Sequence, residues 1–165
     1  MKVKLSEGAF FAIVAAAGEM YKKECYGLLV GKRRGETIKV VAVAVSQKAK
    51  RTFSSIIYTE KYIKSFREIV HCLPKCELIG EFHSHPQFGK RRGYAVLSKA
   101  DLSTCCEALQ IVVSANDVKQ QRKDFVVNSD GTISGIINHI SMHIRAFYVE
   151  DERPTRIPIS CDLLT

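Results

Sequence analysis

Residues 78–86 read Leu-Ile-Gly-Glu-Phe-His-Ser-His-Pro, an apolar run that ends in two histidines and a proline. The apolar run predicts a short strand, and Pro86 marks its end because proline lacks the amide that a sheet ladder needs. Successive side chains of a strand point to opposite faces, so His83 and His85 emerge on the same face. Two imidazoles placed in this way can bind one metal ion.

A third metal ligand follows in the stretch Ser98-Lys99-Ala100-Asp101. Ser98 has the position of a helix N-cap, since Ser-x-x-Asp precedes apolar residues at helical spacing. This places Asp101 in the first turn of a helix, near the end of the predicted strand. Two imidazoles and one carboxylate fill three positions of a catalytic zinc ion and leave the fourth for water. The pattern therefore predicts a catalytic Zn²⁺ site.

These motifs resemble the JAMM (MPN-plus) family of zinc metalloproteases, whose pattern is a distant Glu, then His-Ser/Thr-His-Pro, then Ser-x-x-Asp. Residues 24–31, Glu-Cys-Tyr-Gly-Leu-Leu-Val-Gly, are similar to the opening motif of the family's domain. The resemblance covers residues 1–150 and leaves 151–165 as a C-terminal tail. It implies the JAMM/MPN, cytidine-deaminase-like fold, an α/β domain with a curved mixed sheet flanked by helices.

The resemblance also implies a role for each matched residue. His83, His85 and Asp101 would bind the zinc ion. Glu24 would act as the acid/base residue on the metal-bound water, and Ser98 would help hold the oxyanion. Zinc acidifies bound water and polarises a carbonyl, while a carboxylate passes the proton to the leaving amine, so this set suits amide hydrolysis.

Strand parity alone offers a second candidate for the acid/base residue. Glu81 shares the face of His83 and His85, so the residues by themselves do not decide between Glu81 and Glu24. The family resemblance favours Glu24. Glu81 remains a candidate partner that orients a ligand imidazole, or else a solvated glutamate at the start of the strand.

The connection from Gln87 to Leu97 is longer than is usual for the family. It contains Lys90, Arg91 and Arg92 between two glycines, close to the predicted site. Glycines permit hinge-like backbone angles, and adjacent cations attract acidic partners. We therefore predict a mobile loop that steers or covers an acidic stretch of the substrate.

The rest of the chain predicts one α/β domain without internal repeats. Apolar spacing predicts a first helix from Ser6 to about Lys22 and a second from Thr59 to about Cys72. Further strands are expected at 25–30, 37–45 and 110–114, with one or two long strands over 136–149. The polar run 115–124 predicts a loop, and Asp130-Gly131 a hairpin turn.

Composition narrows the class of protein. The 165 residues contain no long apolar segment and no secretory pattern near Lys2 and Lys4, so we expect a cytoplasmic protein without membrane contact. The formal charge of +8 is spread over short turns without interleaved aromatics, which disfavours nucleic acid.

The six cysteines lack zinc-knuckle spacing and favour buried free thiols, although a disulfide stays open. His139 and His143 have no carboxylate or cysteine nearby, which disfavours a second metal pair.

The family resemblance predicts a zinc-dependent isopeptidase or peptidase that cleaves at the C-terminus of a ubiquitin-like or small β-grasp carrier protein. One alternative is a peptidase that acts on a sulfur-carrier protein or on a small amino-acid conjugate. Another class is a non-catalytic basic scaffold that binds nucleic acid or a partner subunit. The presence of the full set of motif residues argues against the scaffold. The sequence leaves a homodimer open.

Overall fold

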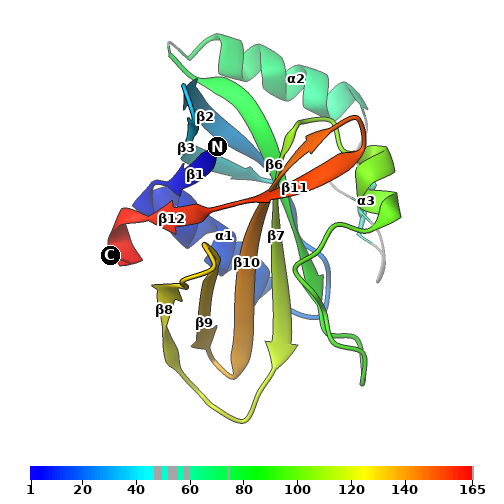
Figure 1. Cartoon of the computed structure of the whole chain (residues 1–165). Helices are drawn as coiled ribbons and strands as arrows, with labels where there is room; N and C mark the ends of the chain where they lie inside the picture. Colours follow the sequence, from blue (N-terminus) through cyan, green and yellow to red (C-terminus); the bar gives the residue numbers. More distant parts are fainter. Residues whose placement is uncertain (47–49, 52–55, 58–59, 74, 165) are drawn as a thin grey trace.

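The strand that carries the two histidines, β6 (Glu77–Pro86), lies in the middle of a ten-stranded mixed sheet (Figure 1). It pairs antiparallel with β2 (Tyr26–Arg34) on one side and parallel with β7 (Leu109–Asp117) on the other. Because both edges of β6 are hydrogen-bonded, its backbone is held along its whole length. The histidines therefore sit on a rigid support.

The computed structural model describes residues 1–46, 50–51, 56–57, 60–73 and 75–164. The sheet follows the order β12-β1-β3-β2-β6-β7-β10-β9-β8, with β11 paired to β10. Its other strands are β1 (Lys2–Leu5), β3 (Thr37–Val45), β8 (Lys123–Val127), β9 (Ile133–Ile137), β10 (Ile140–Glu150), β11 (Arg153–Ile157) and β12 (Ile159–Cys161). A separate ladder pairs β4 (Lys50–Arg51) with β5 (Ile56–Ile57). The helices are α1 (Glu7–Glu19), α2 (Glu60–His71), α3 (Lys99–Thr104) and the 3₁₀ turn η1 (Asp162–Leu164). Among the helices described, none is long and apolar enough to span a membrane.

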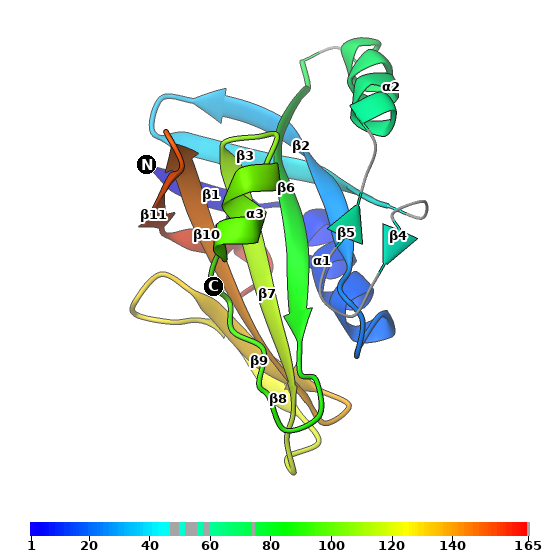
Figure 2. The same ribbon diagram turned by 90° about the vertical axis from the view of Figure 1, so that its right-hand side faces the viewer.

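Helix α1 covers one face of the sheet and encloses the main core (Figure 2). It begins at Ser6, whose side chain accepts a hydrogen bond from the amide of Ala9 at 3.1 Å, as the N-cap pattern predicts. Its buried side chains join Phe82 of β6 and the inward side chains of β7 and β10 in one apolar cluster. Burial of this apolar surface supplies the main driving force for folding.

Two glycines of the 24–31 motif are required by packing on β2. Gly27 is paired with Phe82 of β6, and a Cβ at Gly27 would collide with the phenylalanine ring. Gly31 follows an irregularity in the register with β3, where a Cβ would collide with the carbonyl of Lys39. The spacing of the motif thus reflects close backbone approaches within the sheet.

The opposite face of the sheet carries α3 and the segment 87–98 (Figure 2). Ala95 and Leu97 of this segment pack against Val112 of β7 and Phe147 of β10 in a second, smaller apolar cluster. This cluster holds the segment against the sheet between β6 and α3.

The structure confirms the predicted α/β fold with a curved mixed sheet and flanking helices. The hairpin of β2 and β3 is as predicted. One long strand, β10, covers most of 136–149, while residues 136–137 end the short strand β9 and Asn138-His139 form a turn with positive φ. Residues 128–131 form the turn expected at Asp130-Gly131. The second helix is present as α2, whereas its expected cap, Thr59, lies outside the described residues.

The predicted loop at 115–124 is wrong at both ends, because β7 runs to Asp117 and β8 begins at Lys123. The polar side chain of Asn116 lies within β7 and bonds to the segment 87–98 instead of to solvent. Lys123 and Asp124 belong to an edge strand, where exposed charges are ordinary. Polarity was therefore a poor guide to loops here.

The segment 151–165, expected as a C-terminal tail, contributes two strands to the sheet. Strand β11 pairs with β10, and β12 pairs in parallel with β1 at the other end of the sheet. Ile157, Ile159 and Cys161 are buried in the main core. Burial of these apolar side chains keeps the segment in the domain.

All six cysteines are free thiols in the structure. Cys25 and Cys161 are buried, as expected of structural thiols, whereas Cys72 and Cys106 are exposed. The expectation of buried thiols therefore holds for only part of the set.

Candidate metal centre

Three potential metal ligands converge where β6 ends and α3 begins. His83 and His85 project from one face of β6, and Asp101 from the first turn of α3. One potential ligand atom from each residue lies within 4.8 Å of the other two. The Nε2 atoms of His83 and His85 are 3.7 and 3.5 Å from the Asp101 carboxylate. The structure thus brings together the three side chains that the sequence predicted.

The two imidazoles leave one nitrogen each for the centre. The Nδ1 of His85 donates to the carbonyl oxygen of Tyr94 at 2.9 Å, which fixes the tautomer and frees Nε2 as a ligand. Nε2 of His83 is buried and has no hydrogen-bond partner among the described residues. A buried imidazole nitrogen without a partner is costly, and a bound metal ion would satisfy it.

Asp101 is positioned by the cap of its own helix. The Ser98 amide donates to Asp101 Oδ2 at 2.6 Å, and the Asp101 amide donates to Ser98 Oγ at 3.2 Å. This reciprocal capping box makes the carboxylate a rigid part of the helix start. Burial alone would raise the pKa of Asp101, but the side chains of His83 and His85 hold it well below its usual range. Asp101 is therefore ionised, as a candidate metal ligand has to be.

Glu24 lies two residues before the start of β2. Burial raises the pKa of its carboxyl above the usual range, opposed by the positive charge of His85 and reinforced by the negative charge of Asp101. A carboxyl group whose pKa is shifted toward neutrality suits a group that accepts and returns a proton. The charges of His85 and Asp101 thus both act on the Glu24 carboxyl, and its role as the acid/base residue stays a prediction.

Ser84, between the two histidines, has a role that the sequence reasoning missed. Its Oγ accepts a hydrogen bond from the amide of Cys25 at 2.9 Å, and its own amide donates to the carbonyl of Cys25 at 3.0 Å. Ser84 thereby ties the residue after Glu24 to the strand that carries the histidines. The only signal in the sequence was a hydroxyl between two ligand histidines.

Glu81 is 2% exposed, so the alternative of a solvated glutamate is wrong. Its Oε1 accepts a hydrogen bond from the amide of Cys106 at 2.9 Å, just beyond α3. Glu81 therefore links β6 to the chain that follows the helix of Asp101. This contact makes Glu81 a support of the chain around α3.

The segment 87–97 is held to the sheet at Gly93. The side-chain amide of Asn116 on β7 both accepts from the Gly93 amide at 2.8 Å and donates to the Gly93 carbonyl at 3.0 Å. A Cβ at Gly93 would collide with the carbonyl of His85, so close packing requires this glycine, and the predicted mobility of the loop stays a prediction. Tyr94, which orients His85, follows directly.

The basic residues Lys90, Arg91 and Arg92 are exposed at the outer end of this segment. Phe88 and Arg91 close a tight turn through reciprocal backbone bonds of 2.9 Å, with Gly89 at φ +56°. The cations thus lie on a turn that projects beyond the anchored part. Their predicted interaction with an acidic substrate stays a prediction.

His139 and His143 do not form a second metal pair. His139 lies in the turn between β9 and β10 and bonds to the carbonyl of Lys119, whereas His143 lies on β10 and contacts Thr132. Within the described residues, only His83, His85 and Asp101 form a group of three potential ligands.

Comparisons with known proteins agree with this geometry. Residues 6–128 match the family model of prokaryotic homologs of the JAB domain. The fold is similar to the solution structure of protein DSY2949 from Desulfitobacterium hafniense, with a TM-score of 0.66 and 15% sequence identity. That similarity covers 97% of this chain and 92% of the other. Among curated proteins, none matches the chain. On the strength of a family match that spans most of the sequence, the chain belongs to the prokaryotic homologs of the JAB domain.

Proposed function

We propose that the protein is a zinc-dependent isopeptidase or peptidase that cleaves at the C-terminal tail of a ubiquitin-like or small β-grasp carrier protein. The observation that carries the proposal is the buried Nε2 of His83, which has no hydrogen-bond partner among the described residues and lies 3.7 Å from the Asp101 carboxylate. Membership of the JAB family supports it, because the JAMM motifs of that fold are present here without a missing residue.

The donor set fits zinc better than other common metals. Two imidazole nitrogens and one carboxylate oxygen are the ligands of many catalytic zinc sites, which keep one position open for water or substrate. Magnesium and calcium prefer oxygen ligands and would leave the imidazoles poorly used. His83, His85 and Asp101 would therefore hold Zn²⁺, which supplies an acidified water and a Lewis acid for the carbonyl when bound.

The protein's own groups supply the remaining chemistry. Glu24, with its raised pKa, accepts the proton of the attacking water and returns it to the leaving amine. Ser98 Oγ accepts from the Asp101 amide, and the hydroxyl proton has no acceptor among the described residues. This proton is available to the oxyanion that forms at the substrate carbonyl.

The nature of the substrate comes from the family resemblance. An extended C-terminal tail can lie along a sheet edge and present its last carbonyl to the centre, in the mode of β-augmentation. A sulfur-carrier protein or a small amino-acid conjugate would present the same amide to the same groups. A panel that contains all three kinds of substrate shows which of them the protein cleaves.

The experiment begins with the metal content of the purified protein, measured by mass spectrometry. The metal-loaded protein is then incubated with a panel of ubiquitin-like fusions, sulfur-carrier fusions and small aminoacyl conjugates, with and without a chelator. We expect about one zinc per chain and chelator-sensitive cleavage of at least one carrier fusion. Zinc without cleavage of any amide would favour the non-catalytic scaffold, and a protein that binds no zinc would overturn the proposal.

A further inference from the structure

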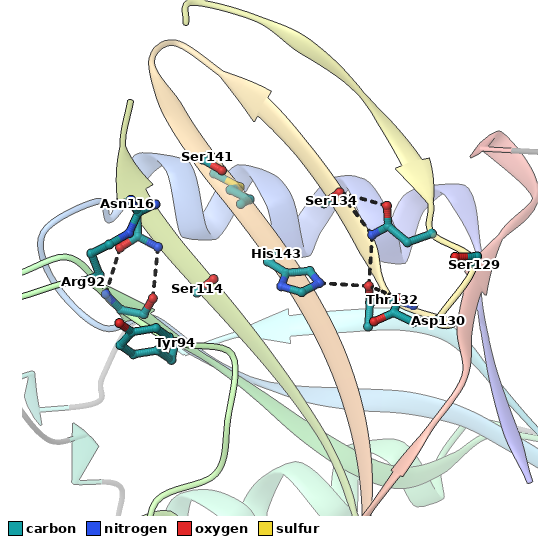
Figure 3. Close-up of a pocket in the computed structure, with 13 residues that line it drawn as sticks. Arg92, Tyr94, Ser114, Asn116, Ser129, Asp130, Thr132, Ser134, Ser141 and His143 are labelled. Carbon is teal, nitrogen blue, oxygen red and sulfur yellow. Dashed lines mark hydrogen bonds between the residues drawn. The ribbon is translucent and has the colours of Figure 1, made fainter. Parts of the chain in front are cut away.

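A groove of about 530 Å³ is lined mostly by polar residues of β7, β9, β10 and the adjacent loops (Figure 3). It lies beside the candidate metal centre, since Ser114 in its lining is paired with His85. One wall is the segment 92–94, which includes Tyr94, and the other is the turn 128–132. Side chains of β7, β9 and β10 line the floor between these walls, among them Ser114, Ser134 and His143. Its volume is in the range of sites that bind small or extended ligands.

The groove is continuous with the metal centre through a row of paired residues. His85 of β6 is paired with Ser114 of β7, Ser114 with His143 of β10, and His143 with Ser134 of β9. Adjacent strands are about 4.8 Å apart, so the row extends roughly 14 Å from His85. An extended peptide advances about 3.3 Å per residue, which gives room for roughly four residues.

The floor of the groove offers both donors and acceptors. The hydroxyls of Ser114 and Ser141 have no hydrogen-bond partner in the part of the chain that the structure describes. The Thr132 hydroxyl donates to Asp130 at 2.7 Å, so the contact of 2.9 Å between Thr132 and His143 uses the Nε2 proton of the histidine. Nδ1 of His143 is then an acceptor. Such a surface suits the alternating amides and carbonyls of a peptide backbone.

Arg92 and Asp130 are the charged side chains in the lining of the groove. Burial and then the charge of Arg145 lower the pKa of His143, which keeps this imidazole neutral. Asp130 is already engaged by Arg156 at 3.5 Å and by Thr132. Arg92 on the opposite wall makes no ion pair with any described residue, and it is exposed. An acidic ligand would therefore pair with the guanidinium of Arg92.

We propose that this groove binds about four residues of an extended, acidic peptide segment, adjacent to the bond that is cleaved at the metal centre. The position relative to a cleaved bond rests on the proposed function, whereas binding in the groove does not. Tyr94 connects the two sites, since its carbonyl orients His85 and its residue lines the groove. An apolar ligand is disfavoured because it would bury the serine hydroxyls without partners.

The test uses the chain as purified, with or without bound metal, carrying Glu24→Gln so that binding is measured without turnover. Two blocked pentapeptides, Gly-Asp-Ser-Asp-Gly and Gly-Lys-Ser-Lys-Gly, are titrated to millimolar concentration while amide shifts are followed by NMR. We expect the acidic peptide to shift the amides of Ser114, Ser134 and Ser141, with an affinity about fivefold higher than that of the basic peptide. Shifts confined to other surfaces, or equal affinities, would overturn the proposal.

A pair of charge reversals gives a matched control. Arg92→Glu should reverse the preference between the peptides, whereas Arg91→Glu, in the adjacent residue that does not line the groove, should leave it unchanged. Reversal by both variants would reveal a general charge effect and contradict a specific groove.

The two proposals fail in different ways. If the acidic peptide binds in the groove but the parent protein lacks zinc or cleaves no amide, only the proposed function is wrong. If cleavage is present and peptide shifts map elsewhere, only the groove proposal is wrong.

Discussion

The two faces of β6 bury different kinds of side chain. On the core face, Phe82 is fully buried and gains its stability from apolar packing under α1. On the other face, Glu81 and His83 are almost as deeply buried, at 2% and 8% exposure, although both are polar. Glu81 accepts a hydrogen bond from a backbone amide, while Nε2 of His83 has no hydrogen-bond partner among the described residues. The comparison teaches that the missing hydrogen-bond partner, more than exposure, marks the face on which the candidate metal centre lies.

Loss of a ligand on the polar face should have the largest effect. His85→Ala removes one of three donors, so most of the zinc should be lost while the fold remains, because the adjacent strands still hold β6. Zinc content and circular dichroism of the purified variant measure both outcomes. Stoichiometric zinc in His85→Ala would sink the ligand assignment.

Substitution of Glu24 and of Glu81 distinguishes a catalytic role from a supporting one. Glu24→Gln should keep the zinc and lower kcat by about two to four orders of magnitude, the usual contribution of an acid/base group. Glu81→Gln should cost much less, since it replaces one acceptor of the Cys106 amide by another. Parallel kinetics on one carrier fusion provide the measurement. A larger loss at Glu81 would reverse the two roles.

The core face should respond in stability and not in metal binding. Phe82→Ala removes a fully buried ring, and we expect the free energy of unfolding to fall by about 3–5 kcal/mol. Phe11→Ala, at an exposed site of α1, is the matched control and should change it by about 0.5 kcal/mol or less. Denaturant unfolding of the zinc-free proteins checks both values. A small loss at Phe82 would contradict its place in the core.

A weaker effect is expected where the polar face is supported from outside. Asn116→Ala removes both bonds to Gly93 and loosens the carbonyl of Tyr94 that orients His85. Zinc affinity should fall about 10- to 100-fold, as for other substitutions of residues that orient a metal ligand. Asn128→Ala removes a comparable amide network at Thr132 and Ser134, away from His85, and serves as control in competition titrations with a chelator. Equal losses for the two variants would argue against positioning by Asn116.

The smallest effect should come from the exposed turn. Neutralising Lys90, Arg91 and Arg92 together should raise KM for an acidic protein substrate a few-fold at low salt and leave a small uncharged conjugate unaffected. Steady-state kinetics at two salt concentrations test this. Identical KM values for parent and triple variant at low salt would show that the turn is only a solvated surface.

Much of the centre could be predicted from local patterns. The parity of His83 and His85 follows from the two-residue period of a strand, and the place of Asp101 follows from the Ser-x-x-Asp capping box. Both depend only on residues close together in the chain. Helix α1, the β2–β3 hairpin and the long strands near the C-terminus were predictable for the same reason.

Contacts between distant segments could not be predicted in this way. Ser84 meets Cys25 across 59 positions, and Asn116 meets Gly93 across 23, because strands from separate parts of the chain become neighbours in the sheet. The pairing of β12 with β1 joins the two ends of the chain and converts an expected tail into part of the core.

The sequence by itself determined which side chains could bind a metal ion, since local backbone periods set their faces. Only the tertiary structure decided that these side chains meet and that a groove continues from the centre. It also decided that Nε2 of His83 has no hydrogen-bond partner among the described residues. The physical reason is that desolvation and hydrogen-bond satisfaction depend on every segment packed around a group, including segments far away in the sequence.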